Sequence, residues 1–235
     1  MLGGVSAAST SHPVASLVLS RLEPTYRAAA DPVKAVAMRA YMRDQFPFLG
    51  VPAPQQTVLA RTVLARLGRP SEEDLRVVAT SCWALAEREF QYFACSYLRR
   101  YQAVCSPSFL SVVRQLLVEK SWWDTIDTLA AQVVGPLVLR SPELVSTMDS
   151  WLSGDNMWLT RTAILHQLAY KGRTDADRLF RYCAARADHP DFFIRKAIGW
   201  ALREYAKIDP EAVRRFVKAQ TTLSGLSVRE ALKNL

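Results

Sequence analysis

The chain has 235 residues, of which half are hydrophobic and 22% are charged, the composition of an ordinary folded protein. Its formal net charge of +8 favours a polyanionic partner. Nucleic acid is the commonest such partner, and ribosomal or acidic-lipid surfaces satisfy the charge equally well. The sequence contains no apolar run of about 18 residues, so a membrane span is not expected.

The cysteines and histidines form no recognisable ligand pattern. Cys82, Cys95, Cys105 and Cys183 are scattered without a C-x-x-C pair, and the three histidines add no metal-ligand spacing. We therefore expect reduced, buried thiols of a cytoplasmic protein, and neither a metal nor a cofactor.

Residues 1–12 are small and polar and carry no lysine or arginine, so they lack the basic start of a secretory signal. We predict a loose N-terminal tail over 1–12 and a single domain over 13–235.

Proline and acidic residues mark the helix starts along the chain. The pairs Asp31-Pro32, Ser106-Pro107, Ser141-Pro142 and Asp209-Pro210 each place a capping residue before a proline at the first helical position, and Ser71 precedes three acids. Six glycines between the apolar segments mark expected helix ends with positive φ. No segment alternates with a period of two, so the chain is predicted to be all α. The predicted helices cover residues 13–29, 32–45, 53–67, 72–85, 87–103, 107–119, 121–134, 136–140, 142–152, 156–171, 174–187, 190–207, 210–220 and 226–234.

The sequence is also repetitive. Arg161, Arg195 and Arg229 open Arg-x-Ala-aliphatic segments at intervals of 34 residues; one interval earlier lies Asp127, and 35 residues before that lies Tyr92. A period of this length with two helices per unit is typical of an α-solenoid. The tetratricopeptide pattern is absent, so HEAT-like antiparallel helix pairs fit better.

In a solenoid these equivalent positions form a stripe, and an arginine-rich stripe on a concave, basic groove suits a phosphate backbone. The one carboxylate in the stripe is Asp127. An alternative remains open: Asp127 and Arg161 can form a salt bridge between repeats, which does not exclude a site.

The segment Lys120–Asp127 joins two tryptophans to two acids. On a helix Trp123 and Asp127 share a face one turn apart, whereas Trp122 pairs with Ile126 on another face. An indole beside an acid is suited to holding a cation. The alternative is that the tryptophans belong to the core and the acid is solvated or ion-paired.

A basic and aromatic face is predicted beside Arg195. Lys196 and Trp200 are spaced i, i+4, and Trp200 and Arg203 are spaced i, i+3. The other tryptophans, Trp83, Trp122, Trp151 and Trp158, are expected to be core residues.

Four segments carry a resemblance to a known family. They are Ala-Tyr-Met-Arg-Asp-Gln-Phe-Pro-Phe-Leu-Gly-Val (40–51), Lys-Ser-Trp-Trp-Asp-Thr-Ile-Asp (120–127), Asp-Asn-Met-Trp-Leu-Thr-Arg (155–161) and Lys-Ala-Ile-Gly-Trp-Ala-Leu-Arg-Glu-Tyr-Ala-Lys (196–207). Over roughly residues 14–235 the chain resembles the DNA alkylation repair enzymes of the AlkD type. Those proteins are HEAT-like-repeat DNA glycosylases that remove N3- and N7-alkylated purines.

The resemblance implies roles for individual residues. The acid matching Asp127 assists base loss, and the tryptophans matching Trp123 and Trp200 cradle the sugar of the damaged nucleotide. The arginine matching Arg161 holds DNA, and the tyrosine matching Tyr41 lies near the lesion. All five positions keep the expected residue type.

The sequence thus predicts a monofunctional glycosylase that hydrolyses the N-glycosidic bond of cationic alkylpurines in double-stranded DNA. A monomer in a bacterial cytoplasm, at the nucleoid, is expected. From the basic stripe, DNA contacts are expected from Arg195, Lys196, Arg203 and Arg229 as well. The alternatives are a non-catalytic or weakly active HEAT-repeat DNA-binding module and, third, an RNA-binding or scaffold solenoid.

Overall fold

The computed structural model describes residues 12–235, so the predicted N-terminal tail lies outside the described residues except for His12. Every helix or strand assigned within 12–235 is a helix, which confirms the all-α prediction. The α-helices are α1 (Pro13–Ala28), α2 (Pro32–Tyr41), α3 (Ala53–Val63), α4 (Glu72–Ala84), α5 (Arg88–Tyr101), α6 (Leu110–Val118), α7 (Trp123–Leu129), α8 (Gly135–Arg140), α9 (Val145–Ser153), α10 (Met157–Leu165), α11 (Ala176–Ala185), α12 (Phe192–Tyr205), α13 (Pro210–Ala219) and α14 (Gly225–Ala231).

The described residues divide into two compact units, 12–97 and 98–235, and the boundary falls within α5. The prediction of one domain over residues 13–235 stays a prediction. In the first unit α1 packs against α3 and α4.

The predicted caps form at three of the five positions. The side chains of Asp31, Ser71 and Asp209 accept hydrogen bonds from the backbone N–H groups that open α2, α4 and α13. Ser106 and Ser141 make no side-chain cap, and each is followed by a 3-10 turn instead of an α-helical start. Hydrogen bonds in a 3-10 turn join residues i and i+3. Such a segment therefore begins without the α-helical first turn, whose backbone N–H groups a capping side chain would accept.

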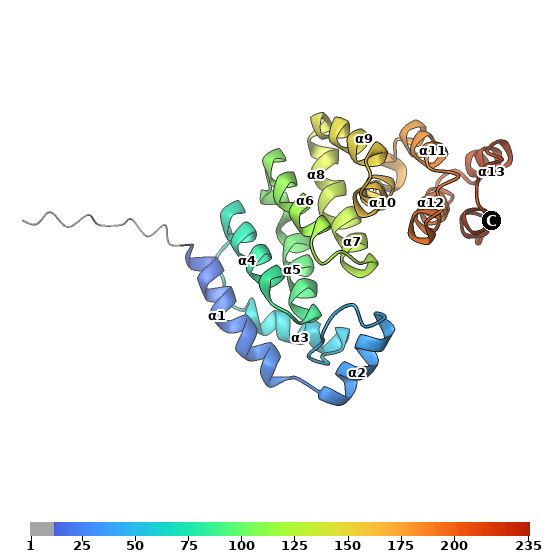
Figure 1. The fold of residues 1–235 in the computed structure, drawn as a ribbon. Helices are drawn as coiled ribbons and strands as arrows, with labels where there is room; N and C mark the ends of the chain where they lie inside the picture. Colours follow the sequence, from blue (N-terminus) through green and yellow to red (C-terminus); the bar gives the residue numbers. More distant parts are fainter. Residues whose placement is uncertain (1–11) are drawn as a thin grey trace, which may run out of the picture. The chain divides into compact units, whose positions relative to one another are not determined.

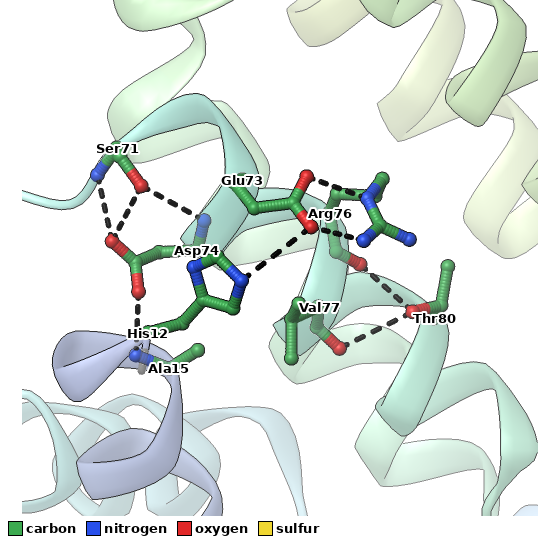
Figure 2. Close-up of polar contacts among 8 residues, drawn as sticks. All are labelled: His12, Ala15, Ser71, Glu73, Asp74, Arg76, Val77 and Thr80. Atoms are coloured by element: carbon green, nitrogen blue, oxygen red, sulfur yellow. Dashed lines mark hydrogen bonds and ion pairs between the residues drawn. The ribbon is translucent and has the colours of Figure 1, made fainter. Parts of the chain in front are cut away.

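One carboxylate ties two helix starts together in the first unit. Asp74 Oδ2 accepts from the backbone N–H of Ser71 at 2.9 Å and from its hydroxyl at 2.7 Å, while Asp74 Oδ1 accepts from the backbone N–H of Ala15 at 2.9 Å (Figure 2). Since Asp74 is buried, these bonds fix where α1 begins relative to α4.

A second carboxylate holds the turn before α3. Glu89, buried in α5, accepts from the backbone N–H groups of Leu49, Gly50 and Val51 at 3.0, 2.8 and 3.1 Å. Gly50 has φ +87°, and a Cβ there would lie 2.0 Å from the carbonyl oxygen of Asp31, so glycine is required.

The other glycines do not follow the expectation of a positive φ. Gly50 is the only glycine with positive φ among the described residues, and Gly135 and Gly225 lie at the first positions of α8 and α14. The left-handed positions are occupied by Arg43, Asp44, Arg66, Lys120 and Lys171. Those at Arg43, Asp44 and Arg66 follow α2 and α3, which end earlier than the sequence predicts.

The second unit is built from two rows of helices. In one row α7, α10, α12 and α14 pack each against the next, and α9, α11 and α13 pack onto the helices of this row. Figure 1 shows α9, α11 and α13 along one side of this unit and α7, α10 and α12 along the other.

The predicted repeat period recurs in the contacts between helices. Hydrogen bonds join Asp127 to Arg161, Leu152 to Arg186 and Lys196 to Glu230, and each pair is 34 residues apart. The first and third pairs link neighbouring helices, α7 with α10 and α12 with α14, in the row formed by α7, α10, α12 and α14, which we call the inner row. The period therefore reflects one repeated packing arrangement along the second unit.

All four cysteines are buried, as predicted. Burial raises the pKa of the Cys82 and Cys183 thiols well above their usual range, so these thiols stay protonated. No helix within residues 12–235 is long and apolar enough to cross a membrane.

Candidate functional site

The tryptophan pair marks the start of α7. Lys120 has φ +48° and Trp122 is fully extended, so the helix begins at Trp123, two residues later than the sequence predicts. Trp122 therefore lies outside the helix, whereas Trp123 and Asp127 lie one turn apart on α7 as expected. Directly after α7, residues 130–134 form a π-helical turn that continues into α8.

Asp127 forms a bidentate ion pair with Arg161 of α10. Arg161 Nε donates to Oδ1 at 2.7 Å and Nη2 donates to Oδ2 at 2.8 Å, and Nη1 donates to the carbonyl oxygen of Phe193. The side chains of Arg161 and Asp127 are 3% and 15% exposed, respectively. This ion pair is the salt bridge between repeats that the sequence analysis gave as an alternative. The Arg161 side chain is nearly inaccessible, whereas the Asp127 side chain is partly exposed.

The protonation of Asp127 is set by two opposing effects. Burial raises the pKa of its carboxyl above the ordinary range, and the contacts with Arg161 oppose that rise because they favour the charged form. Each oxygen accepts one bond from Arg161 and keeps lone-pair capacity for another donor or for a nearby cation. Arg161 thus orients the carboxylate without using all of its acceptor sites.

Aromatic rings pack beside this ion pair. The centroids of Trp122, Trp158 and Phe193 lie 5.1 to 5.8 Å from one another. Phe193 also stands 6.0 Å from the Arg161 guanidinium, measured to its ring centroid. The sequence expected Trp122 and Trp158 in the core; both are half-buried and belong to this cluster instead. Sequence reasoning missed Phe193, whose carbonyl and ring both contact Arg161.

The predicted basic and aromatic face exists on α12, but it is not purely basic. Lys196 Nζ donates to Glu230 Oε1 at 2.6 Å, and Arg203 Nη1 donates to Glu230 Oε2 at 2.5 Å. Trp200 is half-buried between these positions on the same helix. Glu230 was not predicted, although it follows Lys196 by 34 residues, the same interval that separates Asp127 from Arg161.

The remaining predicted DNA contacts lie in different surroundings. Arg195 donates to the carbonyl oxygens of Asp191, at 3.4 Å, and Pro190, at the start of its own helix. Arg229 is exposed on α14. Tyr41 ends α2 in the first unit and is 71% exposed.

The structure therefore brings together Asp127 with Arg161, and Lys196 with Arg203. Trp123 shares α7 with Asp127, while Trp200 stands on α12, beyond α10 in the inner row. Among residues 12–235 no group of three or more histidine, cysteine or acidic side chains could hold a metal ion. The chemistry available at this site is electrostatic: a fixed carboxylate, indole rings and several cations.

The chain is similar to a known protein family and to solved structures. The family model described as "DNA alkylation repair enzyme" matches residues 22–235. A solved structure described as a predicted DNA alkylation repair enzyme from Enterococcus faecalis is 31% identical, with a TM-score of 0.81 over 88% of this chain and 96% of that one. The structure of smu.31 from Streptococcus mutans UA159 is 17% identical, with a TM-score of 0.58 over 77% of this chain and 92% of that one, and shares the fold. No functionally curated protein matches the sequence.

Proposed function

Because the chain belongs to the DNA alkylation repair enzyme family, we propose that it is a DNA glycosylase that removes cationic N3- and N7-alkylated purines from duplex DNA. The observation that carries the proposal is the Asp127 carboxylate: it is held in one orientation by Arg161, remains partly exposed, and lies one helical turn from Trp123.

The chemistry of the substrate explains why so few groups are needed. Alkylation at N3 or N7 gives the purine a positive charge, so the base leaves without being protonated. As the bond between C1′ and the base nitrogen breaks, positive charge moves to the sugar, and the base departs with the bonding electrons. The enzyme must then stabilise an oxocarbenium-like sugar and admit water to C1′.

Asp127 supplies the stabilisation. A preorganised carboxylate near C1′ favours the cationic sugar more than it favours the substrate, and this difference lowers the barrier. Because Arg161 already holds the carboxylate, little reorganisation is required during the reaction. Asp127 also accepts a hydrogen bond from the attacking water and orients it.

Trp123 and Trp200 add attraction through their ring faces, worth about 1–2 kcal/mol each when water is excluded. Lys196, Arg203, Arg195 and Arg229 provide affinity for the phosphate backbone that does not depend on sequence and falls with salt. Arg161, which the resemblance assigned to the DNA backbone, is only 3% exposed and is bonded to both Asp127 and Phe193, so its proposed role here is to orient Asp127. Tyr41 is proposed to lie near the lesion.

In this proposal the protein acts as a monomer on double-stranded DNA, at the nucleoid of a bacterial cytoplasm. The inner row of the second unit forms part of a concave HEAT-like groove. An open groove leaves the damaged base stacked and accommodates adducts of different size.

The second candidate is a DNA-binding module without catalytic activity. It is favoured by one observation: Asp127 is paired with a buried arginine, as a purely structural residue between repeats would be. In that case the carboxylate would serve the packing of α7 on α10 and no reaction.

Single-turnover release of 7-methylguanine from methylated duplex DNA separates the two candidates. The wild type is expected to release the base, and Asp127→Asn is expected to be slower by about 100-fold or more while binding duplex DNA as well or better, because a charge that repels phosphate is removed. No release by the wild type, with salt-dependent duplex binding intact, would support the binding module.

A further inference from the structure

Three charged side chains from two helices form one cluster, with Glu230 bonded to two cations. The carboxylate of Glu230, on α14, is 14% exposed and accepts one hydrogen bond from Lys196 and one from Arg203, both on α12. The two cations are 39% and 22% exposed. Bonding to Lys196, and then the charge of Lys196 and Arg203, holds the pKa of the Glu230 carboxyl below its usual range.

The two cations flank Trp200. Residues 196, 200 and 203 follow the i, i+4, i+7 spacing, so they lie along one face of α12 with the indole in the middle. One carboxylate therefore fixes the side chains on both sides of the indole that is proposed to face the sugar.

Backbone packing places Glu230 independently of its charge. A Cβ on Gly199 would lie 2.4 Å from the Glu230 Cβ and 2.9 Å from the carbonyl oxygen of Ser227, so glycine is what allows α14 to approach α12 this closely. The buried Ser227 hydroxyl donates to the carbonyl oxygen of Arg195 at 2.9 Å and holds α14 in one register.

The cations keep donors for another partner. An ammonium has three N–H groups and a guanidinium has five, and only one from each residue goes to Glu230. A single acid is shared by two cations, and both cations remain partly exposed. The arrangement is suited to holding cations in place for a ligand of opposite charge.

We propose that Glu230 is a positioning residue for the reaction: it holds Lys196 and Arg203 on either side of Trp200, so that the indole keeps the orientation that stabilises the cationic sugar. This inference rests on the proposed glycosylase function. It also assigns Glu230 a restraining effect on DNA affinity, because it offsets one of the two positive charges.

The test compares three variants of the full chain. Glu230→Gln removes the charge with little change in size, Glu230→Asp keeps the charge but shortens the side chain, and Glu204→Gln is the control. Glu204 lies on α12, the helix that carries Lys196 and Arg203, and pairs with Lys207 at 2.6 Å, so the control makes the same charge change at a different ion pair. For each protein we would measure the single-turnover rate at saturating enzyme, affinity for undamaged duplex at several salt concentrations, and the midpoint of thermal unfolding.

Glu230→Gln is expected to lower the rate constant by about 10-fold, because a displaced catalytic group loses roughly one to two orders of magnitude. Its affinity for undamaged duplex is expected to rise, with a salt slope steeper by about one unit as a cation is released to phosphate. Glu230→Asp is expected to lower the rate while keeping the wild-type salt slope, and Glu204→Gln to change neither.

Three results would overturn the role of Glu230 alone: a wild-type rate in Glu230→Gln, an equal loss in Glu204→Gln, or a loss accounted for by the unfolded fraction. If the wild type itself releases no base, the proposed function fails and the positioning role fails with it. The salt slope of Glu230→Gln then still reports whether Glu230 restrains DNA binding, so the two failures are distinguishable.

Discussion

Carboxylates accept hydrogen bonds from different kinds of donor in the two units of this protein. In the first unit, Asp74 and Glu89 are buried and accept hydrogen bonds from backbone N–H groups at helix starts and turns. Figure 2 shows those of Asp74. In the second unit, Asp127 and Glu230 are partly exposed and accept hydrogen bonds from side-chain cations of the neighbouring inner-row helix.

The difference indicates which acids serve the fold and which serve a ligand. A buried carboxylate bonded to the backbone determines where the chain runs and has no route to a substrate. A carboxylate that is bonded to arginine or lysine, on a partly exposed side chain, has its orientation fixed and retains acceptor capacity. We expect substitution of Asp74 or Glu89 to change stability alone, and substitution of Asp127 or Glu230 to change activity as well.

The largest effect on stability is expected from Arg161→Ala. This change leaves the Asp127 carboxylate mostly buried with no cation, and breaking such a pair costs about 3–5 kcal/mol. Urea unfolding measures this cost. Arg195→Ala is the control, because the Arg195 side chain donates to carbonyl oxygens at the start of its own helix. A cost of about 1 kcal/mol or less for Arg161→Ala would show that the pair is not what holds α7 to α10.

The next largest loss of stability, about 1–3 kcal/mol, is expected from Glu89→Gln. The amide nitrogen of glutamine cannot accept the hydrogen bond from a backbone N–H that one carboxylate oxygen of Glu89 accepts. The excision rate of the folded protein should not change. Glu87→Gln is the control: Glu87 pairs with Arg27 at the surface, where a salt bridge is worth about 0–1 kcal/mol. If Glu89→Gln slows base release in fully folded protein, the division of roles between the two units is wrong.

The dependence of excision on pH reports on Asp127 directly. The active form is the carboxylate, so the rate should fall as the pH falls through the pKa of Asp127, which burial raises above the ordinary range. Arg161→Lys offers one charged nitrogen in place of a bidentate guanidinium and should move this acidic limb to higher pH. Measurements of the excision rate between acid and neutral pH would show this shift of the acidic limb. A limb that shifts to lower pH, or does not move, would contradict the pairing.

The smallest effect is expected from Arg229→Ala. Arg229 is exposed on α14, so its loss should change stability by no more than about 0.5 kcal/mol. Affinity for damaged and undamaged duplex should weaken alike, and the salt slope should become shallower by about one unit. An unchanged salt slope would show that Arg229 does not contact the DNA.

Much of the fold could be predicted because it depends on short-range signals. Proline after a capping residue, apolar periodicity and the 34-residue interval place nearly every helix to within a few residues. The errors have local causes. At the starts of α6 and α9, 3-10 turns replace the expected caps of Ser106 and Ser141, and Lys120 delays α7 because its left-handed φ cannot be deduced from its side chain.

The site could be predicted only in part, for a different reason. Asp127 and Trp123 lie within one helical turn, so sequence spacing alone relates them. The bonding of Arg161 to Phe193 and the sharing of Glu230 depend on how closely the helices pack, and for Glu230 that closeness is permitted by Gly199. Packing distance between helices leaves no trace in the spacing of polar residues.

The central claim is that Asp127 serves the reaction whereas Glu89 serves the fold, and one paired measurement tests it. The single-turnover rate of 7-methylguanine release and the free energy of unfolding would be determined on the same preparations of wild type, Asp127→Asn and Glu89→Gln. The account predicts a rate loss of about 100-fold or more for Asp127→Asn and none for Glu89→Gln in folded protein, although Glu89→Gln is destabilised. Equal rates for wild type and Asp127→Asn would contradict the account.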